Sequence, residues 1–183
     1  RPGSHVYNRA LMASMIAAKG ENDAEKWAKG LVSNLAKRPQ GNDRSQLKSI
    51  YSGECDVAII NHYYYGKLTY SKNPDHRKWA KASIIVFPNQ GNSDRGAHVN
   101  ISGGGVVKFS KNKEIAINFL EFLVTDQAQV MYGDVNFEYP INNKSKLPKR
   151  LKALGTFKED NLLIEKIAKL APKAQEIIDK VYW

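Results

Sequence analysis

Two short, continuously apolar runs constrain the fold of this chain more than any other feature. They are DVAIIN at residues 56–61 and SIIVF at residues 83–87. Runs of this length, without polar alternation, are typical of strands buried on both faces of a parallel sheet. Amphipathic helical patterns precede and follow them, at residues 8–19, 23–36 and 112–124. Strands that alternate with helices predict an α/β fold with mostly parallel pairing.

The sequence also predicts several helix boundaries. Asn8 and Asn61 stand where helices are expected to begin, and asparagine is a preferred N-cap residue. Gly20 follows the first helical pattern and is expected to end it. The remaining helical patterns lie at residues 44–51, 63–70, 126–132 and 162–183, the last with an expected interruption around Pro172.

The composition, with 42% hydrophobic and 25% charged residues, is typical of a globular protein. The 183 residues are enough for one ordinary domain or for two small lobes. Lys and Arg number 28 against 18 Asp and Glu, a formal net charge of +10 that suits nucleic acid, an acidic surface or simple solubility. No apolar run approaches the ~20 residues of a membrane-spanning helix.

The chain lacks the common catalytic and metal-binding motifs. It has no Walker loop, no GxSxG and no HExxH. The glycines of SGGGVVK are not followed by the Lys-Ser/Thr pair of a nucleotide-binding loop, so a hinge or strand bend is the simpler interpretation. The four histidines show no local metal-ligand spacing, and the single cysteine, Cys55, excludes an internal disulfide and a cysteine-based zinc site.

Three consecutive tyrosines follow the first apolar run, in NHYYYGKL at residues 61–68. Tyr63 and Tyr64 fall in the first turn of the expected helix, at the carboxyl edge of a parallel sheet, where α/β folds place their ligands. Tyr7 stands at a similar strand-to-helix junction, in HVYNRA. A phenol has a pKa near ~10, so only a strongly Lewis-acidic cation such as ferric iron would deprotonate it at neutral pH. The alternative, that these rings pack a core or shape a cleft without a metal, stays open at this point.

The motif NHYYYGKL resembles the Asn-x-Tyr-Tyr motif of the periplasmic ferric-iron-binding proteins, the substrate-binding subunits of bacterial iron ABC transporters. The similarity covers essentially the whole chain. RPGSHVYNRALMASMIAAKG resembles the beginning of the second lobe in this family, and WAKGLVSNLAKRPQGNDRSQLKSIYSGECDVAIIN resembles the run into the tyrosines. GAHVNISGGGVVKFSKNKEIAINFLEFL and FEYPI resemble the return crossing and the segment after it. The cyanobacterial Fut-type branch fits best.

The resemblance implies the type II fold of periplasmic solute-binding proteins, in which two α/β lobes joined by crossing strands clamp iron between them. Residues 1–96 would form the second lobe, and residues 97–140 a return crossing that belongs to the first lobe. Residues 141–183 would be C-terminal helices that pack back on the second lobe. The chain opens at Arg1 in what looks like the end of a strand, so we expect first-lobe sequence upstream and weak iron binding by this chain alone.

The resemblance also implies a set of iron ligands. Tyr63 and Tyr64 match the ligand pair that follows Asn-x, and Tyr7 matches a further tyrosine ligand of the cyanobacterial branch. Tyr65 occupies a position that is aromatic in relatives but is not a ligand. Asn61 fits a role in helix capping or anion contact. The family supplies at least one more ligand from the first lobe.

Ferric iron is the implied transported ligand, and other branches of the family hold it together with a synergistic anion such as carbonate. That anion would lie near residues 3–5 here, and whether this chain needs one is left open. Arg1, Arg9 and Arg95 are candidates for balancing the charge of the tyrosinates, and His98 could lie around the ligands, although packing at a hinge is the simpler role.

Transport of this kind makes and breaks no bond in the solute, so we expect a protein that is not an enzyme. The implied partner is an inner-membrane ABC permease, and the implied setting is a monomer in the periplasm. The main alternative keeps the fold and replaces iron by a small organic ligand or anion, such as a polyamine, a sugar or a phosphate ester, with the tyrosines as stacking platforms. A basic nucleic-acid-binding domain is disfavoured, because the sequence contains no recognised nucleic-acid-binding motif.

Overall fold

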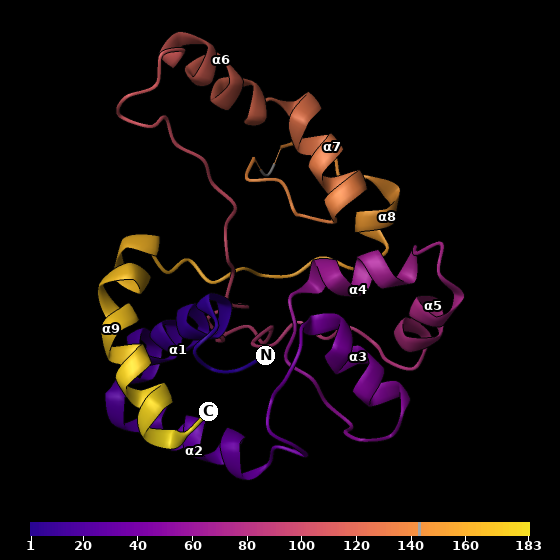
Figure 1. The fold of residues 1–183 in the computed structure, drawn as a ribbon, viewed down its shortest axis with the longest axis vertical. Coiled ribbons are helices and arrows are strands. Elements are labelled where there is room, and N and C mark those ends of the chain that lie inside the picture. Colours follow the sequence, from indigo (N-terminus) through magenta and orange to yellow (C-terminus); the bar gives the residue numbers. More distant parts are fainter. Residues whose placement is uncertain (143) are drawn as a thin grey trace. The chain divides into compact units, whose positions relative to one another are not determined.

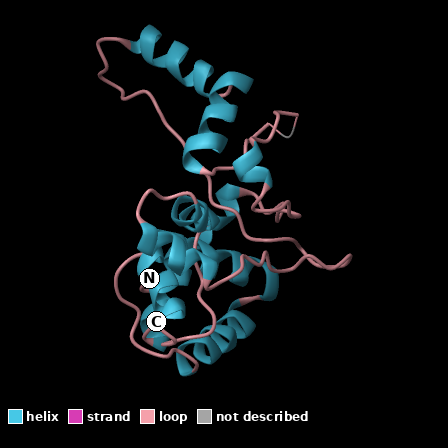
Figure 2. Ribbon diagram, turned by 90° about the vertical axis from the view of Figure 1, so that its right-hand side faces the viewer, coloured by secondary structure: helices cyan, strands magenta, loops and turns pink. Residues whose placement is uncertain are grey.

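The computed structural model describes residues 1–142 and 144–183, which form helices joined by loops (Figures 1 and 2). The helices are α1 (Val6–Lys19), α2 (Glu21–Ser33), α3 (Asp43–Tyr51), α4 (His62–Thr69), α5 (Pro74–Lys81), α6 (Lys113–Leu123), α7 (Asp126–Asn136), α8 (Lys149–Lys152) and α9 (Ile164–Val181). Within these residues no helix combines the length and the hydropathy of a membrane span.

The chain divides into two compact units, and both are discontinuous in sequence. The first unit contains Arg1–Ile60, Val86–Asn100 and Phe157–Trp183. The second unit contains Asn61–Ile85 and Ile101–Thr156. Tyr7 therefore belongs to the first unit, whereas Tyr63 and Tyr64 belong to the second.

The start of α1 differs from the prediction by a few residues. His5 is the N-cap, and its ring nitrogen Nδ1 accepts a hydrogen bond from the Tyr7 N–H at 3.3 Å. The predicted N-cap, Asn8, lies inside the helix, and its side-chain amide donates to the carbonyls of Arg1 and Pro2. Gly20 ends α1 with a φ of 79°, a left-handed value that glycine adopts without strain, so this part of the prediction is confirmed.

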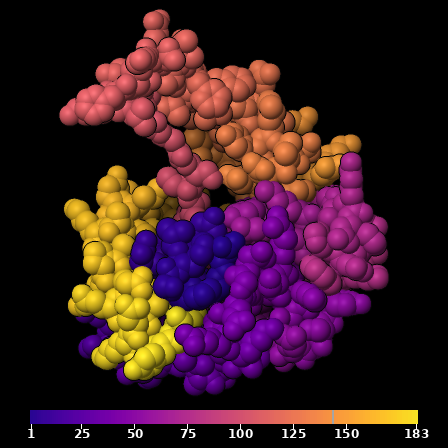
Figure 3. Space-filling view, in the orientation of Figure 1, coloured from indigo at the N-terminus to yellow at the C-terminus, as the bar shows by residue number. Residues whose placement is uncertain are grey.

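The core of the first unit lies between α1, α2 and α9. Helix α1 packs against both of the others, and Figure 3 shows the indigo N-terminal segment beside the yellow C-terminal helix. Trp27 and Trp183 close one end of this core, with their ring centroids 5.8 Å apart in an edge-to-face arrangement. The buried residues of the core are Met12, Ala13, Met15, Ile16, Ala24, Ala28, Ala174, Ile177, Ile178 and Val181.

Helix α9 is continuous through Pro172, so the predicted interruption is wrong. A proline inside a helix removes one backbone hydrogen bond and costs about 3 kcal/mol. The turns after it bury Ile177, Ile178 and Val181 in the core of the first unit. At about 1.5–3 kcal/mol per buried aliphatic side chain, this packing outweighs the defect.

The strands that the sequence predicts are not formed by the described residues. Residues 56–61 and 83–87 form no strand pairing. The β-bridge in the described part of the chain is isolated and pairs Ala97 with Glu159. The side chains of Val57 and Ile84 are 82% and 83% exposed. A strand buried on both faces needs hydrogen-bonded neighbours on both edges, and these runs have none within the described ranges. The described chain is therefore helix-rich, and only the helical part of the α/β prediction is realised in it.

The second unit is built from α4 and α5, which contact each other, and from the consecutive helices α6, α7 and α8. One buried cluster of this unit contains Phe137, Leu151 and Leu154, and Leu68, Ala80 and Ala128 are buried in the unit as well. Tyr63, Tyr65, Tyr139 and Leu147 pack around the cluster and are partly buried. One of the candidate ligands, Tyr63, therefore packs on this cluster together with its neighbour Tyr65.

Candidate metal centre

Helix α4 begins at the position that the sequence predicts. Asn61 is the N-cap, with an extended backbone (φ −80°, ψ 133°), and its carbonyl accepts a hydrogen bond from the Tyr64 N–H at 3.1 Å. Its side chain makes no capping hydrogen bond, so the prediction is correct for the position and wrong for the side chain. Backbone N–H groups in the first turn of a helix attract negative charge, and Tyr63 and Tyr64 lie in this turn.

The structure brings Tyr63 and Tyr64 close together. Their ring centroids are 4.3 Å apart and their planes are inclined by 34°, and both residues are half-buried. Adjacent helical residues diverge by about 100°, so two neighbouring rings can converge in this way where a helix begins. Lys67, one turn further along α4, places its ammonium group 5.3 Å from the Tyr63 ring centroid. The result is a pair of phenols with a cation beside them.

Tyr65 has a hydrogen-bond partner of its own within the second unit. Its ring packs against the core of the second unit, and its hydroxyl donates to the Ser83 carbonyl at 3.3 Å. The prediction that Tyr65 packs is therefore confirmed.

Tyr7 lies in the first turn of α1 and is also half-buried. The His5 ring meets it edge to face with centroids 4.6 Å apart, and the Arg1 guanidinium lies 5.4 Å from its ring centroid. Arg1 also forms an ion pair with Asp43, whose side chain is almost completely buried. Burial and the nearby Arg1 lower the pKa of His5, which favours its neutral form as N-cap acceptor. Tyr7 thus has a polar setting of its own in the first unit, with one cation, Arg1, beside its ring.

Of the other candidate cations, Arg95 is engaged in a structural network of the first unit. It pairs with Asp160 at 2.5 Å and donates to the Ser14 carbonyl at 3.2 Å. His98, in the same unit, contacts Asn100 at 3.3 Å, and burial lowers its pKa. These contacts agree with a packing role for both residues.

Sequence reasoning missed two residues around the tyrosine pair. Lys67 could have been found from its spacing, because residues four apart in a helix share a face. His62 gave no such signal, because its partner lies far along the chain: its Nε2 donates to the Phe137 carbonyl at 2.6 Å. Burial lowers the pKa of His62, so the ring is neutral at pH 7.

Tyr139, another partly buried tyrosine of the second unit, has a backbone hydrogen-bond partner. Its hydroxyl donates to the Gly155 carbonyl at 2.6 Å, and burial raises its pKa to about 12. A phenol with such a pKa stays protonated at neutral pH, so Tyr139 acts as a structural hydrogen-bond donor.

The raised pKa of Tyr139 predicts a late step in an alkaline titration. In the folded chain the group's contribution to stability is complete below the unfolded pKa of ~10 and is lost as the pH rises towards 12. We expect the phenolate absorbance of Tyr139 to appear last, and Tyr139→Phe to remove that step. Tyr182→Phe, which deletes an exposed phenol, should leave the late step in place. A late step that persists in Tyr139→Phe would contradict this assignment.

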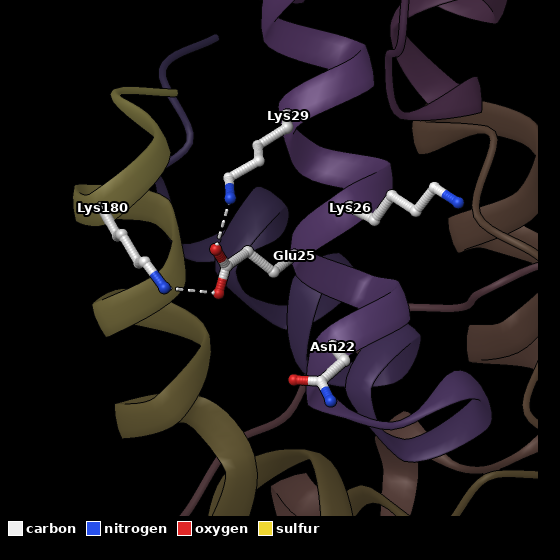
Figure 4. A pocket seen from close by; sticks show the side chains of 5 residues that line it. All are labelled: Asn22, Glu25, Lys26, Lys29 and Lys180. Carbon is white, nitrogen blue, oxygen red and sulfur yellow. Dashed lines mark hydrogen bonds and ion pairs between the residues drawn. The ribbon is translucent and has the colours of Figure 1, made fainter.

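A surface pocket lies elsewhere in the first unit, over α2 and α9 (Figure 4). Glu25 is at its centre and accepts from both Lys29, at 2.7 Å, and Lys180, at 2.8 Å. Hydrogen bonds from Lys180 and Lys29 hold the pKa of the Glu25 carboxyl below its usual value. Asn22 and Lys26 complete the lining. The one carboxylate of this pocket, that of Glu25, is already paired with two lysines. We therefore interpret the residues of the pocket as a surface ion-pair cluster that links α2 to α9.

Histidine, cysteine and carboxylate side chains do not gather into a metal-binding cluster of three or more anywhere in residues 1–142 and 144–183. The tyrosines are thus the side chains on which the candidate metal centre depends.

Comparison with known proteins gives a consistent result. A family model described as bacterial extracellular solute-binding protein matches residues 9–130. Iron uptake protein A1 of Synechocystis is 41% identical over 183 residues, which are 100% of this chain and 50% of that protein. The major ferric iron-binding protein of Neisseria meningitidis serogroup B is 32% identical over 141 residues, 77% of this chain and 40% of that protein. The chain thus spans about half the length of the curated relatives it matches.

Solved structures agree with the sequence comparison. A Trichodesmium protein, IdiA or FutA, in complex with iron and citrate ligands, matches with a TM-score of 0.93 and 43% identity, over 100% of this chain and 57% of that protein. The ferric binding protein from Campylobacter jejuni matches with a TM-score of 0.92 and 41% identity, over 99% of this chain and 57% of that protein.

Proposed function

Because the chain belongs to the bacterial extracellular solute-binding proteins, we propose that it forms part of the ferric-iron-binding subunit of a bacterial ABC transporter. The observation that carries this proposal is the convergence of Tyr63 and Tyr64, with ring centroids 4.3 Å apart, in the first turn of α4. The names of the relatives, which refer to iron uptake and ferric iron binding, support iron as the cargo. The subunit would carry iron through the periplasm to a membrane permease and would catalyse no reaction.

The chemistry of the pair suits a hard trivalent cation. Tyrosinate is an established protein ligand of iron, and a phenol with a pKa near ~10 gives up its proton readily only to a strong Lewis acid. The first turn of α4 offers the positive end of a helix dipole, and Lys67 adds a full positive charge 5.3 Å from the Tyr63 ring. Both features offset the negative charge of bound tyrosinates.

Tyr7 is proposed as a third ligand. It belongs to the other compact unit, so its part in the same centre rests on the resemblance of HVYNRA to the second-lobe segment of the Fut-type proteins. Three tyrosinates neutralise the three charges of ferric iron. A further ligand from the first lobe would make the centre anionic; Arg1 lies 5.4 Å from the Tyr7 ring centroid, but its charge is already paired with Asp43.

We assign the chain to the type II fold, with residues 1–96 in the second lobe, residues 97–140 as the return crossing into the first lobe, and residues 141–183 as the C-terminal helices. Closure of the lobes would complete the coordination shell, and opening or reduction to ferrous iron would release the cargo. An anion is proposed to share the shell, since the similar Trichodesmium structure contains both iron and citrate.

The proposal is tested by titrating the 183-residue chain with ferric nitrilotriacetate and recording the visible spectrum. We expect a tyrosinate-to-iron charge-transfer band that disappears when dithionite reduces the iron. We also expect weaker binding than by full-length Synechocystis iron uptake protein A1, because first-lobe ligands do not contribute. A chain that stays colourless with ferric iron, but is stabilised against heat by a polyamine, a sugar or a phosphate ester, would favour the organic-ligand alternative.

A further inference from the structure

Phe137, from a distant part of the chain, lies against one face of α4 at three positions, and Tyr139 and Arg150 contact the two ends of the same face. His62, Gly66 and Tyr70 follow one another at intervals of four and share this face. The His62 Nε2 donates to the Phe137 carbonyl at 2.6 Å, and the Tyr70 ring stacks on the Phe137 ring, with centroids 5.5 Å apart and planes inclined by 14°. Between them, a Cβ atom at Gly66 would lie 2.6 Å from two carbons of the Phe137 ring. Phe137 therefore contacts the start, the middle and the end of the helix.

The backbone of Phe137 is in an unfavourable conformation. Its φ of 61° and ψ of 29° place it in the left-handed region, at the C-cap of α7. Bulky residues rarely adopt this region, and they remain there only where the surrounding structure stabilises them. Phe137 is 3% exposed and packs with Leu151 and Leu154. The strained turn is thus held by the core and by the face of α4.

The glycine at position 66 allows Phe137 to approach α4 closely. Glycine is unfavourable in the middle of a helix, because it loses more conformational freedom than other residues do. Gly66 is buried, and any side chain there would overlap the Phe137 ring. Gly30, in the last turn of α2, has open space around its Cβ position and makes no comparable contact.

We infer that Phe137, with Gly66 and His62, positions the tyrosine pair by fixing the axial rotation and the start of α4. This inference rests on the proposed function, because the pair is taken to bind ferric iron. Tyr63 and Tyr64 follow His62 directly, so a rotation or shift of the helix moves both phenols. Tyr63 also packs on the core that contains Phe137. The three residues are positioning residues, since they act on iron only through the tyrosines.

The test compares Gly66→Ala with Gly30→Ala, the same change in a helix without the contact. Gly66→Ala should shift the maximum of the ferric charge-transfer band and weaken ferric binding at least fivefold, whereas Gly30→Ala should leave both unchanged. The double variant Gly66→Ala/Phe137→Leu replaces the ring by a smaller side chain, which makes room for the added methyl group, and should restore part of the affinity. His62→Gln keeps an N–H donor near the Nε2 position and should bind more tightly than His62→Leu. A wild-type band and affinity in Gly66→Ala would overturn the inference.

Amide hydrogen exchange of α4 separates this inference from the proposed function. Gly66→Ala should speed exchange in α4 relative to wild type, with or without iron, and Gly30→Ala should not. If the wild-type chain shows no charge-transfer band, the proposed function fails. Exchange then decides whether Phe137 fixes α4: faster exchange in Gly66→Ala supports that contact, and unchanged exchange overturns it.

Discussion

Replacing Tyr63 or Tyr64 by phenylalanine is expected to weaken ferric binding by more than ~100-fold and to reduce the charge-transfer absorbance. Loss of residues that merely surround metal ligands already costs about 10–100-fold in affinity, and a lost ligand should cost more. Phenylalanine keeps the ring and its packing, so the folded chain should retain its helical circular dichroism. The double variant should remain colourless with ferric nitrilotriacetate.

Tyr65→Phe is the matched control for these variants. It removes the same hydroxyl from the next residue, where the group donates to the Ser83 carbonyl at 3.3 Å. Its charge-transfer band and ferric affinity should equal those of the wild type. If Tyr65→Phe weakened binding as much as Tyr63→Phe does, Tyr65 would have to be added to the ligands and the assignment of the pair would be wrong.

Replacing Asp43 by alanine is expected to destabilise the first unit by about 3–5 kcal/mol, because breaking a buried ion pair leaves the partner's charge uncompensated. The Asp43 side chain is 3% exposed and that of its partner, Arg1, is 17% exposed. Glu21→Ala is the control, since Glu21 also stands in the first turn of a helix of the first unit and pairs with Lys173, at 58% and 40% exposure. That change should cost no more than about 1 kcal/mol.

Urea unfolding followed by tryptophan fluorescence can measure this difference in the first unit alone. Trp27 and Trp183 lie in that unit, whereas Trp79 lies in the second, so a Trp79→Phe background removes the emission of the second unit. Equal losses of stability in Asp43→Ala and Glu21→Ala would show that the Arg1–Asp43 pair contributes no more than an exposed one.

Local signals predict the helices of this chain well and its strands poorly. Asn42 begins α3 and forms a capping box with Ser45, an arrangement that involves only neighbouring residues. Helix α5 was missed, although Asn73 caps it and Pro74 occupies its first turn, a combination that marks a helix start. The apolar runs 56–61 and 83–87 have the composition of strands, yet a strand exists only where another strand pairs with it. The composition of a run does not show whether such a partner strand is present.

In the candidate site, too, features that depend on neighbouring residues can be predicted and contacts between distant residues cannot. The adjacency of Tyr63 and Tyr64 at the start of a helix can be read from the sequence, and their convergence from helix geometry. The hydrogen bond of His62 to Phe137 cannot, because it joins residues 75 positions apart. The left-handed backbone of Phe137 cannot be predicted from the sequence either, because the segment FEYPI has the character of a short extended piece.

The discontinuity of the two units has a consequence for synthesis of the protein. The ribosome releases Asn61–Ile85 and Ile101–Thr156, the whole of the second unit, before it releases the last stretch of the first. Helix α9 is in that last stretch and supplies four of the buried residues of the first core, so that core is incomplete until Phe157–Trp183 emerges. The tyrosine pair and the residues that hold it can thus reach their final arrangement while the core that contains α1 and α2 still lacks α9.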